Sequence, residues 1–190
     1  ADFARDNPGI RLDMRQAHSQ ILKDMLHEGQ VDIALGPPEI ATRVPGASSS
    51  ILFESPMVIL ASRYHPLAGR IAVTRTDLEA ARWALHQPGS GIRIAADQLL
   101  AQIGLGESLQ ANELPSNMIL SLLRMGDHLA VVPRYVLANT SLAGELVQID
   151  SGKAQVSLSH AALWTDRSSS PAVGRFVEHM HRSLNRLGEI

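Results

Sequence analysis

Segments typical of β-strands and of amphipathic helices alternate along almost the whole chain of 190 residues. Apolar and charged residues alternate over 10–15, which predicts a half-buried strand. A helical stripe follows over 19–28, with Ser19 as a candidate N-cap, and an apolar strand follows over 31–35. Strands joined by helices of this length favour a parallel sheet with right-handed crossovers. The chain is therefore predicted to belong to the α/β class.

The alternation continues to the end of the chain. Strands are expected at 51–53, 56–62, 83–86, 109–113, 129–132, 146–149 and 156–164, and helices at 91 to about 103, at 116–125 and from 171 onward. These units fall into two groups, and the last strand and helix can rejoin the first group. We therefore predict two subdomains joined by two crossovers, with a central cleft: residues 1–72 with 161–190, and residues 73–160.

The composition excludes several classes of protein. The chain has no cysteine, so it has neither a disulfide framework nor a thiolate metal site. Its net charge of -2 makes it a poor candidate to bind DNA directly. The longest apolar run, Met57–Ala61, is too short to span a bilayer. We expect a protein without membrane segments, and the lack of cysteine fits the reducing cytoplasm.

No chemical signature of an enzyme stands out. A third glycine is missing from each candidate dinucleotide fingerprint, and there is no Walker sequence and no Gly-x-Ser-x-Gly elbow. The histidines lack metal-ligand spacing: His179 and His181, for example, are two apart on a helix and point to different faces. No paired carboxylates are placed for acid–base chemistry. The sequence predicts no catalytic residue, no metal site and no cofactor.

Several segments together carry a resemblance to a known family. In chain order they are His27–Leu35 with a GxxDxA junction, Tyr64–Arg70 with His-Pro-Leu-Ala, Pro88–Arg93, Arg124–Pro133, and Ser170–Val173. Their order and separations over nearly the full chain resemble the effector-binding domain of LysR-type transcriptional regulators. Asp127-His128 departs mildly from the family pattern, which has a glycine-containing turn there.

The resemblance implies a fold and a function. It implies two Rossmann-like subdomains with the architecture of periplasmic binding proteins, and a small-molecule effector held in the cleft; an organic anion is one candidate class. It also implies a homodimer or homotetramer in the cytoplasm that contacts DNA only through an N-terminal helix-turn-helix domain absent from this chain. The family has a central strand before the helix at 2–6. Losing that strand would be costly, so we expect it to lie upstream of Ala1.

The loop at Pro88–Arg93 is the most informative candidate for a ligand site. Gly89 and Gly91 allow close approach of a ligand to the backbone, and Ser90 can donate a hydrogen bond. The N–H groups of the following helix suit a carboxylate or phosphate, and Arg93 in its first turn would be relieved by an anion. The ordinary alternative is a strand-to-helix turn with Ser90 as the N-cap.

Other helix starts and strand ends complete the candidate site. Ligands of open parallel sheets bind beyond the carboxyl ends of the strands. The ligand-binding candidates are Ala17, His18, Ser19, Gly36, Pro37, Pro88, Gly89, Ser90, Gly91, Arg93, Ser116 and Asn117. A plain cap explains Ser19 or Ser116 equally well, and a plain turn explains Gly36 and Pro37.

Three functions compete at this point. The first is the effector sensor of a transcriptional regulator, and the alternative is an extracytoplasmic solute-binding protein of a transporter, which needs the same cleft. An enzyme is the third. The preceding sequence discriminates the first two, because an export signal supports the transporter component and a helix-turn-helix with a linker helix supports the regulator.

Overall fold

The computed structural model describes residues 2–106, 109–138, 144–150 and 152–186. The chain divides into two compact units: unit 1 is Ala1–Glu54 with Ser159–Ile190, and unit 2 is Ser55–Leu158. The sequence placed the first boundary after residue 72. The difference arises because β2 (Ala47–Ser62) is one unbroken strand shared by both units, where the sequence suggested a loop and two short strands.

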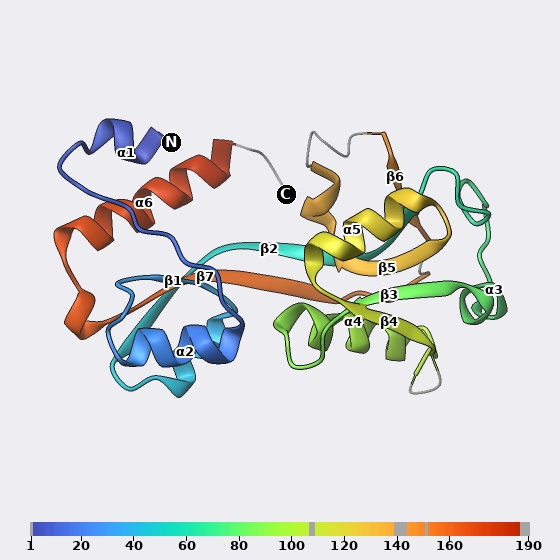
Figure 1. The fold of residues 1–190 in the computed structure, drawn as a ribbon, viewed down its shortest axis with the longest axis horizontal. Helices are drawn as coiled ribbons and strands as arrows, with labels where there is room; N and C mark the ends of the chain where they lie inside the picture. The colour runs from blue at the N-terminus through green and yellow to red at the C-terminus, as the bar shows by residue number, and fades with distance from the viewer. Residues whose placement is uncertain (1, 107–108, 139–143, 151, 187–190) are drawn as a thin grey trace. The chain divides into compact units, whose positions relative to one another are not determined.

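Unit 1 is built around β1 (Ala34–Gly36) and β7 (Ser157–Thr165), which pair antiparallel, and β7 is also hydrogen-bonded to β2 (Figure 1). Leu35 of β1 lies opposite Ala162 of β7. Helix α2 (Ser19–His27) and the 3₁₀ helix η1 (Pro38–Arg43) cover this pair. The buried core shared by these elements consists of Leu26, Ala34, Ile40, Val44, Ala161 and Leu163.

The predicted strand at 10–15 is wrong. This segment has no strand structure, and Leu12 and Met14 are 41% and 89% exposed. Alternation produces a strand only where a neighbouring strand accepts its backbone hydrogen bonds. Among the described residues, β1 pairs only with β7, and it does so antiparallel. The parallel crossover predicted for the first 36 residues is therefore absent from the described chain.

The C-terminal helix of unit 1 begins as the sequence predicted. Helix α6 (Pro171–Arg186) starts with a proline, and Ser170 Oγ accepts a hydrogen bond from the N–H of Val173 at 3.3 Å. Helix α1 (Asp2–Asp6) contacts α6 through Phe3, whose ring lies edge-on to Phe176 with centroids 5.0 Å apart. The remaining short element of this unit is the 3₁₀ helix η4 (Asp166–Ser168).

Unit 2 contains a mixed sheet in the order β6-β2-β5-β3-β4. Strand β3 is parallel to β4 and β5, and β2 is antiparallel to β5 and β6. The bounds are α3 Arg75–Ala80, β3 Arg82–His86, α4 Gly91–Gln102, β4 Ala111–Leu114, α5 Ser116–Met125, β5 His128–Pro133, η2 Arg134–Ala138 and β6 Leu146–Ile149. The predicted α/β class is confirmed.

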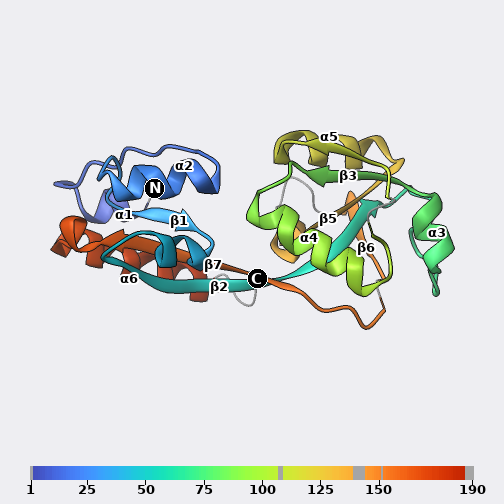
Figure 2. The same cartoon turned by 90° about the horizontal axis from the view of Figure 1, so that it is seen from below.

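Two helices cover opposite faces of this sheet, because successive side chains of a strand point to opposite sides. In β2, Met57 and Ile59 belong to the cluster with Leu99 of α4, whereas Val58 and Leu60 belong to the cluster with Ile119 of α5. Figure 2 shows α4 and α5 of unit 2 from below. In β3, Trp83 and Leu85 face α4 and Ala84 faces α5. The alternation therefore directs the next residue, His86, to the α5 side.

Candidate functional site

The topology of unit 2 brings two helix starts to one edge of the sheet. Strand β3 ends at His86 and leads into α4, and its parallel neighbour β4 ends at Leu114 and leads into α5. His86 and Leu114 are register partners. Because the carboxyl ends of parallel strands meet at one edge, the start of α4 and the start of α5 share that edge, where α/β sheets bind ligands.

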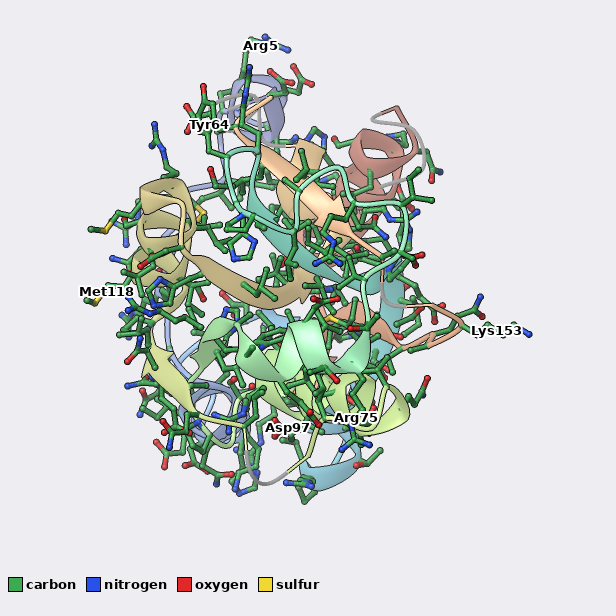
Figure 3. The ribbon with its side chains drawn as sticks, turned by 90° about the vertical axis from the view of Figure 1, so that its right-hand side faces the viewer. Arg5, Tyr64, Arg75, Asp97, Met118 and Lys153 are labelled. Atoms are coloured by element: carbon green, nitrogen blue, oxygen red, sulfur yellow. The ribbon has the colours of Figure 1, made fainter. Side chains whose placement is uncertain are left out.

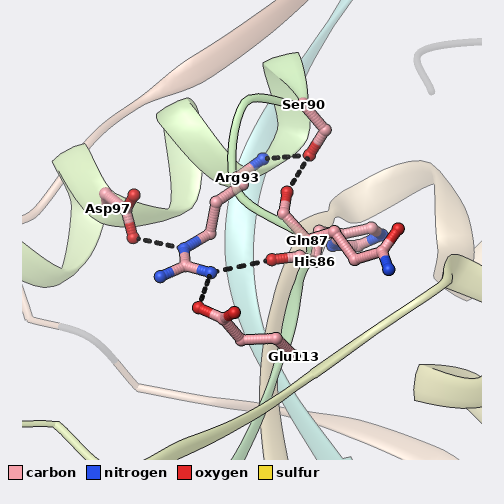
Figure 4. A network of polar contacts seen from close by, with 6 residues as sticks. All are labelled: His86, Gln87, Ser90, Arg93, Asp97 and Glu113. Atoms are coloured by element: carbon pink, nitrogen blue, oxygen red, sulfur yellow. Dashed lines mark hydrogen bonds and ion pairs between the residues drawn. The ribbon is translucent and has the colours of Figure 1, made fainter. Parts of the chain in front are cut away.

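Ser90 caps α4 with both functions of its hydroxyl (Figure 4). Its Oγ accepts a hydrogen bond from the N–H of Arg93 at 3.2 Å and donates its proton to the carbonyl of Gln87 at 3.0 Å. The predicted ligand contact needs that same proton. The structure therefore favours the capping role of Ser90. Gly89, in the loop before it, has a φ of +80°, which favours glycine.

Arg93 turns toward the chain itself. Its Nε donates to Asp97 at 2.8 Å, and its Nη1 donates to Glu113 at 2.8 Å and to the carbonyl of His86 at 2.9 Å. The side chain is 18% exposed. Figure 4 shows the guanidinium joining α4 to the ends of β3 and β4. From the sequence, an external anion was expected beside this charge, but two carboxylates of the chain already neutralise it.

The electrostatics of Arg93 agree with these contacts. Burial by itself would lower the pKa of Arg93, but the hydrogen bonds and charges of Glu113 and Asp97 outweigh that effect and raise its pKa. Arg93 is therefore a cation whose side chain links α4 to the ends of β3 and β4.

The start of α5 is different because no side chain caps it. Pro115 occupies the N-cap position and makes no capping hydrogen bond. Ser116, predicted as the cap, is instead the first helical residue, and its Oγ lies 3.1 Å from Nε2 of His86. Ser116 and Asn117 are both exposed. Among the described residues, no acceptor receives the backbone N–H of either residue.

His86 lies beneath this helix start. It is 6% exposed, and its Nδ1 is buried without a hydrogen-bond partner within the described chain. Burial, followed by the positive charge of Arg93, lowers the pKa of the His86 imidazole below its ordinary value of 6.5. His86 is therefore neutral at physiological pH.

His86 was not among the residues predicted from the sequence to form the site. The available signal was its position as the last residue of the strand 83–86, one step in alternation after Ala84. Strand alternation predicts its face, but only the tertiary structure shows that this face carries the start of α5. The described α5 side of the sheet also holds a second buried histidine, His128, which is 7% exposed.

The other candidates lie in unit 1. Ala17, His18 and Ser19 lie at the start of α2, and Gly36 and Pro37 lie at the end of β1. Because α2 and β1 are consecutive and packed together, the start of the helix and the end of the strand lie at one end of unit 1. Ser19 is not the N-cap: His18 occupies that position, without a side-chain capping bond, and Ser19 is the first helical residue.

A hollow of about 490 Å³ lies elsewhere on unit 2, at the C-terminal end of α4. Its lining residues include Gln102 and Ile103 of this end, together with Arg75 and Lys153, which Figure 3 labels on the face it shows. None of the predicted ligand-binding residues lines this hollow. The hollow lies at the opposite end of α4 from Ser90.

Within the described ranges 2–106, 109–138, 144–150 and 152–186, no group of three or more His, Cys, Asp or Glu residues could hold a metal ion. In the same ranges, no helix has the length and apolar character needed to cross a membrane.

Comparison with known proteins identifies the family. The sequence pattern of the LysR substrate binding domain matches residues 1–185. The chain belongs to this family. It is 32% identical over 144 residues to the HTH-type transcriptional regulator CbbR of Cereibacter sphaeroides. The aligned region covers 75% of this chain and 46% of that protein. The LysR resemblance predicted from the motifs is confirmed.

Solved structures agree with the LysR assignment. The regulatory domain of CcmR from Synechocystis PCC6803, in complex with 2-PG, has a TM-score of 0.76 at 18% identity and covers 96% of this chain and 88% of that chain. The effector binding domain of QuiR, in complex with shikimate, also has a TM-score of 0.76, at 16% identity, and covers 100% of this chain and 89% of that chain. Both likenesses establish the fold.

The LysR domain described here is shorter than its curated relatives. It covers 46%, 37% and 62% of three transcriptional regulators that it matches. It therefore spans about half the length of those proteins.

Proposed function

We propose that this LysR substrate binding domain is the effector sensor of a transcriptional regulator. A small molecule binds to the domain without being chemically changed, and the bound form alters how a DNA-binding domain elsewhere in the protein meets its operator. The match to the LysR family over residues 1–185 carries this proposal. The related regulator from Cereibacter sphaeroides supports the link to transcription.

The residues proposed to contact an effector form one group in each unit. In unit 2 these are Pro88 and Gly89 in the loop before α4, Gly91 as the first residue of α4, and Ser116 and Asn117 as the first two residues of α5. In unit 1 they are Ala17–Ser19 and Gly36–Pro37. The small molecules bound by CcmR and QuiR, 2-PG and shikimate, support an effector of metabolite size.

Ligand binding shifts an equilibrium between conformations only as far as the affinities for those conformations differ. We propose that effector binding favours one arrangement of the regulator and so changes its affinity for DNA. The regulator acts in the cytoplasm as a homodimer or homotetramer, and its DNA contacts come from outside this chain. The net charge of -2 supports DNA contacts made from outside this chain.

A thermal-shift screen of the domain against a metabolite library tests the sensor function. A ligand that binds only the native state raises the unfolding midpoint as its concentration increases. DNA footprinting with the full-length regulator, with and without each hit, then measures the coupling. A hit that stabilises the domain and changes operator occupancy supports the proposal. Hits that leave operator occupancy unchanged contradict it.

The alternative, a solute-binding protein of a transporter, has less support. The named relatives are transcriptional regulators, and none of them is a transport protein. Enzymatic turnover of a hit, abolished by substitution of Ser116, would contradict binding without chemistry. Mass spectrometry of each hit after incubation with the domain provides that measurement.

A further inference from the structure

The His86–Ser116 pair contains a constraint that the proposed function does not use. Nε2 of His86 lies 3.1 Å from Oγ of Ser116, and Nδ1 is buried with no partner among the described residues. A neutral imidazole carries one proton, on either nitrogen. Two arrangements of the pair are therefore available. Ser116 Oγ either accepts a hydrogen bond from Nε2–H and keeps its own proton for a ligand, or donates its proton to an unprotonated Nε2.

The burial of Nδ1 distinguishes these arrangements. With the proton on Nδ1, a buried N–H donor would have no acceptor, which native structures rarely contain. With the proton on Nε2, the imidazole donates to Ser116 Oγ and only a lone pair on Nδ1 lacks a partner. Unsatisfied buried acceptors are tolerated better than unsatisfied donors. The structure therefore favours the Nε2–H tautomer.

This tautomer determines what Ser116 can do. Once Ser116 Oγ accepts a hydrogen bond from His86, its own proton is free, and the described chain offers it no acceptor. Ser116 and Asn117 are exposed residues, and their backbone N–H groups also have no acceptor among the described residues. Three donors without an acceptor among the described residues then lie in the first turn of a ten-residue helix, at its positive end.

We propose that His86 is a positioning residue that fixes Ser116 as a hydrogen-bond donor, and that the start of α5 thereby selects an oxyanion of the effector, a carboxylate or a phosphate. This inference rests on the proposed function, since it names the chemical group that the sensor recognises. His86 itself does not touch the ligand. It acts through the direction in which the Ser116 hydroxyl points.

The first test is the tautomer of His86 in the ligand-free chain. Nitrogen-15 chemical shifts of the imidazole, measured by NMR at pH 7.5, distinguish Nε2–H from Nδ1–H. The expected result is the Nε2–H form. An Nδ1–H form overturns the inference, and because no ligand is present, this result leaves the proposed sensor function untouched.

The second test uses inorganic phosphate as the probe and the amide signal of Ser116 as the readout. In His86→Gln, the amide nitrogen occupies the place of Nε2 and keeps the donor, so we expect phosphate affinity close to that of the parent. In His86→Asn, the amide lies at the place of Nδ1 and cannot reach Ser116. We expect a loss of about tenfold, the size of one hydrogen bond to a charged group.

A double-mutant cycle separates positioning from general damage. Ser116→Ala alone is expected to match His86→Asn, and the combination is expected to lose no more than either change, because both remove one donor. The matched control is His128→Gln: His128 is 7% exposed, but its Nδ1 and Nε2 contact Asp127 and Asn112. It should leave phosphate binding unchanged.

Equal affinity of His86→Gln and His86→Asn, additive losses in the double variant, or no response of the parent to phosphate each overturn the inference. If library effectors still bind in the thermal-shift screen while phosphate does not, the sensor function stands and the oxyanion subsite falls. If the chain binds phosphate but no organic effector, the oxyanion subsite stands and the sensor function falls.

Discussion

The two helix starts at one edge of unit 2 follow neighbouring parallel strands, yet they differ in how their polar groups are used. At α4, Ser90 caps the helix and Arg93 binds two carboxylates and a carbonyl. At α5, Pro115 provides no cap, and Ser116 interacts only with His86 among the described residues. The first start uses its side chains for stability, and the second leaves donors available.

This contrast shows why a resemblance between helix starts is a weak guide to ligand contact. Both starts have serine near the first turn, and both lie where α/β sheets bind ligands. A hydroxyl has one proton, so a serine that donates to the chain cannot donate to a ligand. The partners of Ser90 and Ser116, rather than their positions, separate a structural role from a binding role.

The largest expected effect is at Arg93. Arg93→Met keeps the length of the side chain but leaves the carbonyl of His86 and the carboxylate of Glu113 without their donor. We expect a loss of about 2 kcal/mol in the free energy of unfolding, measured by urea denaturation. Arg82→Met removes a more exposed pair with Asp127 and should cost less than about 0.5 kcal/mol. Equal losses would contradict the assigned role of Arg93.

Serine substitutions test the contrast directly. Ser90→Ala removes an N-cap and should lower the free energy of unfolding by about 1 kcal/mol, with phosphate affinity unchanged. Ser116→Ala removes no cap and should lower it by less than about 0.5 kcal/mol. Urea denaturation and phosphate titration of the same two variants measure both effects. A loss of phosphate affinity in Ser90→Ala would restore Ser90 as a ligand contact.

A smaller effect is expected from pH. Burial lowers the pKa values of His65 and His86, with a further lowering from His128 and Arg93 respectively; Asp127 opposes the shift at His65. Below the ordinary pKa of 6.5, these histidines become protonated in the unfolded chain but stay neutral in the folded chain. The contribution of these two imidazoles to the free energy of unfolding is therefore fully present above pH 6.5. It is lost as the pH falls below 6.5 toward the lowered pKa values of the folded chain.

Thermal unfolding at pH 7.5 and pH 5.5 measures this dependence. The midpoint of the parent should fall at the lower pH, and His86→Gln should show a smaller fall because one of the two histidines is gone. An identical fall in both proteins would show that His86 does not contribute. The same variant keeps the donor to Ser116, so this comparison separates the charge of His86 from its hydrogen bond.

Much of the fold was predictable because it depends on local periodicity. The strand at 146–149 and the starts of α4 and α6 agree with the prediction. The strand at 10–15 failed because alternation reports a favourable side-chain pattern but not the presence of a pairing neighbour. The unbroken β2 was missed because the Ser- and Pro-containing stretch before residue 57 resembles a loop, although it lies in a strand.

The candidate site divides in the same way. Gly89, Ser90 and Ser116 could be selected from their positions after predicted strands. The binding of Arg93 to Glu113, 20 residues later, could not, because β3 and β4 must pair first. Likewise, His86 reaches Ser116 across 30 residues only when both parallel strands end at one edge.

By itself, the sequence determined the α/β class, most helix and strand positions and the LysR family, because these depend on local spacing and on motifs in a set order. Tertiary structure alone decided which polar groups remain free. A side chain's available hydrogen bonds depend on what the rest of the chain brings within about 3 Å, and no local pattern records that distance.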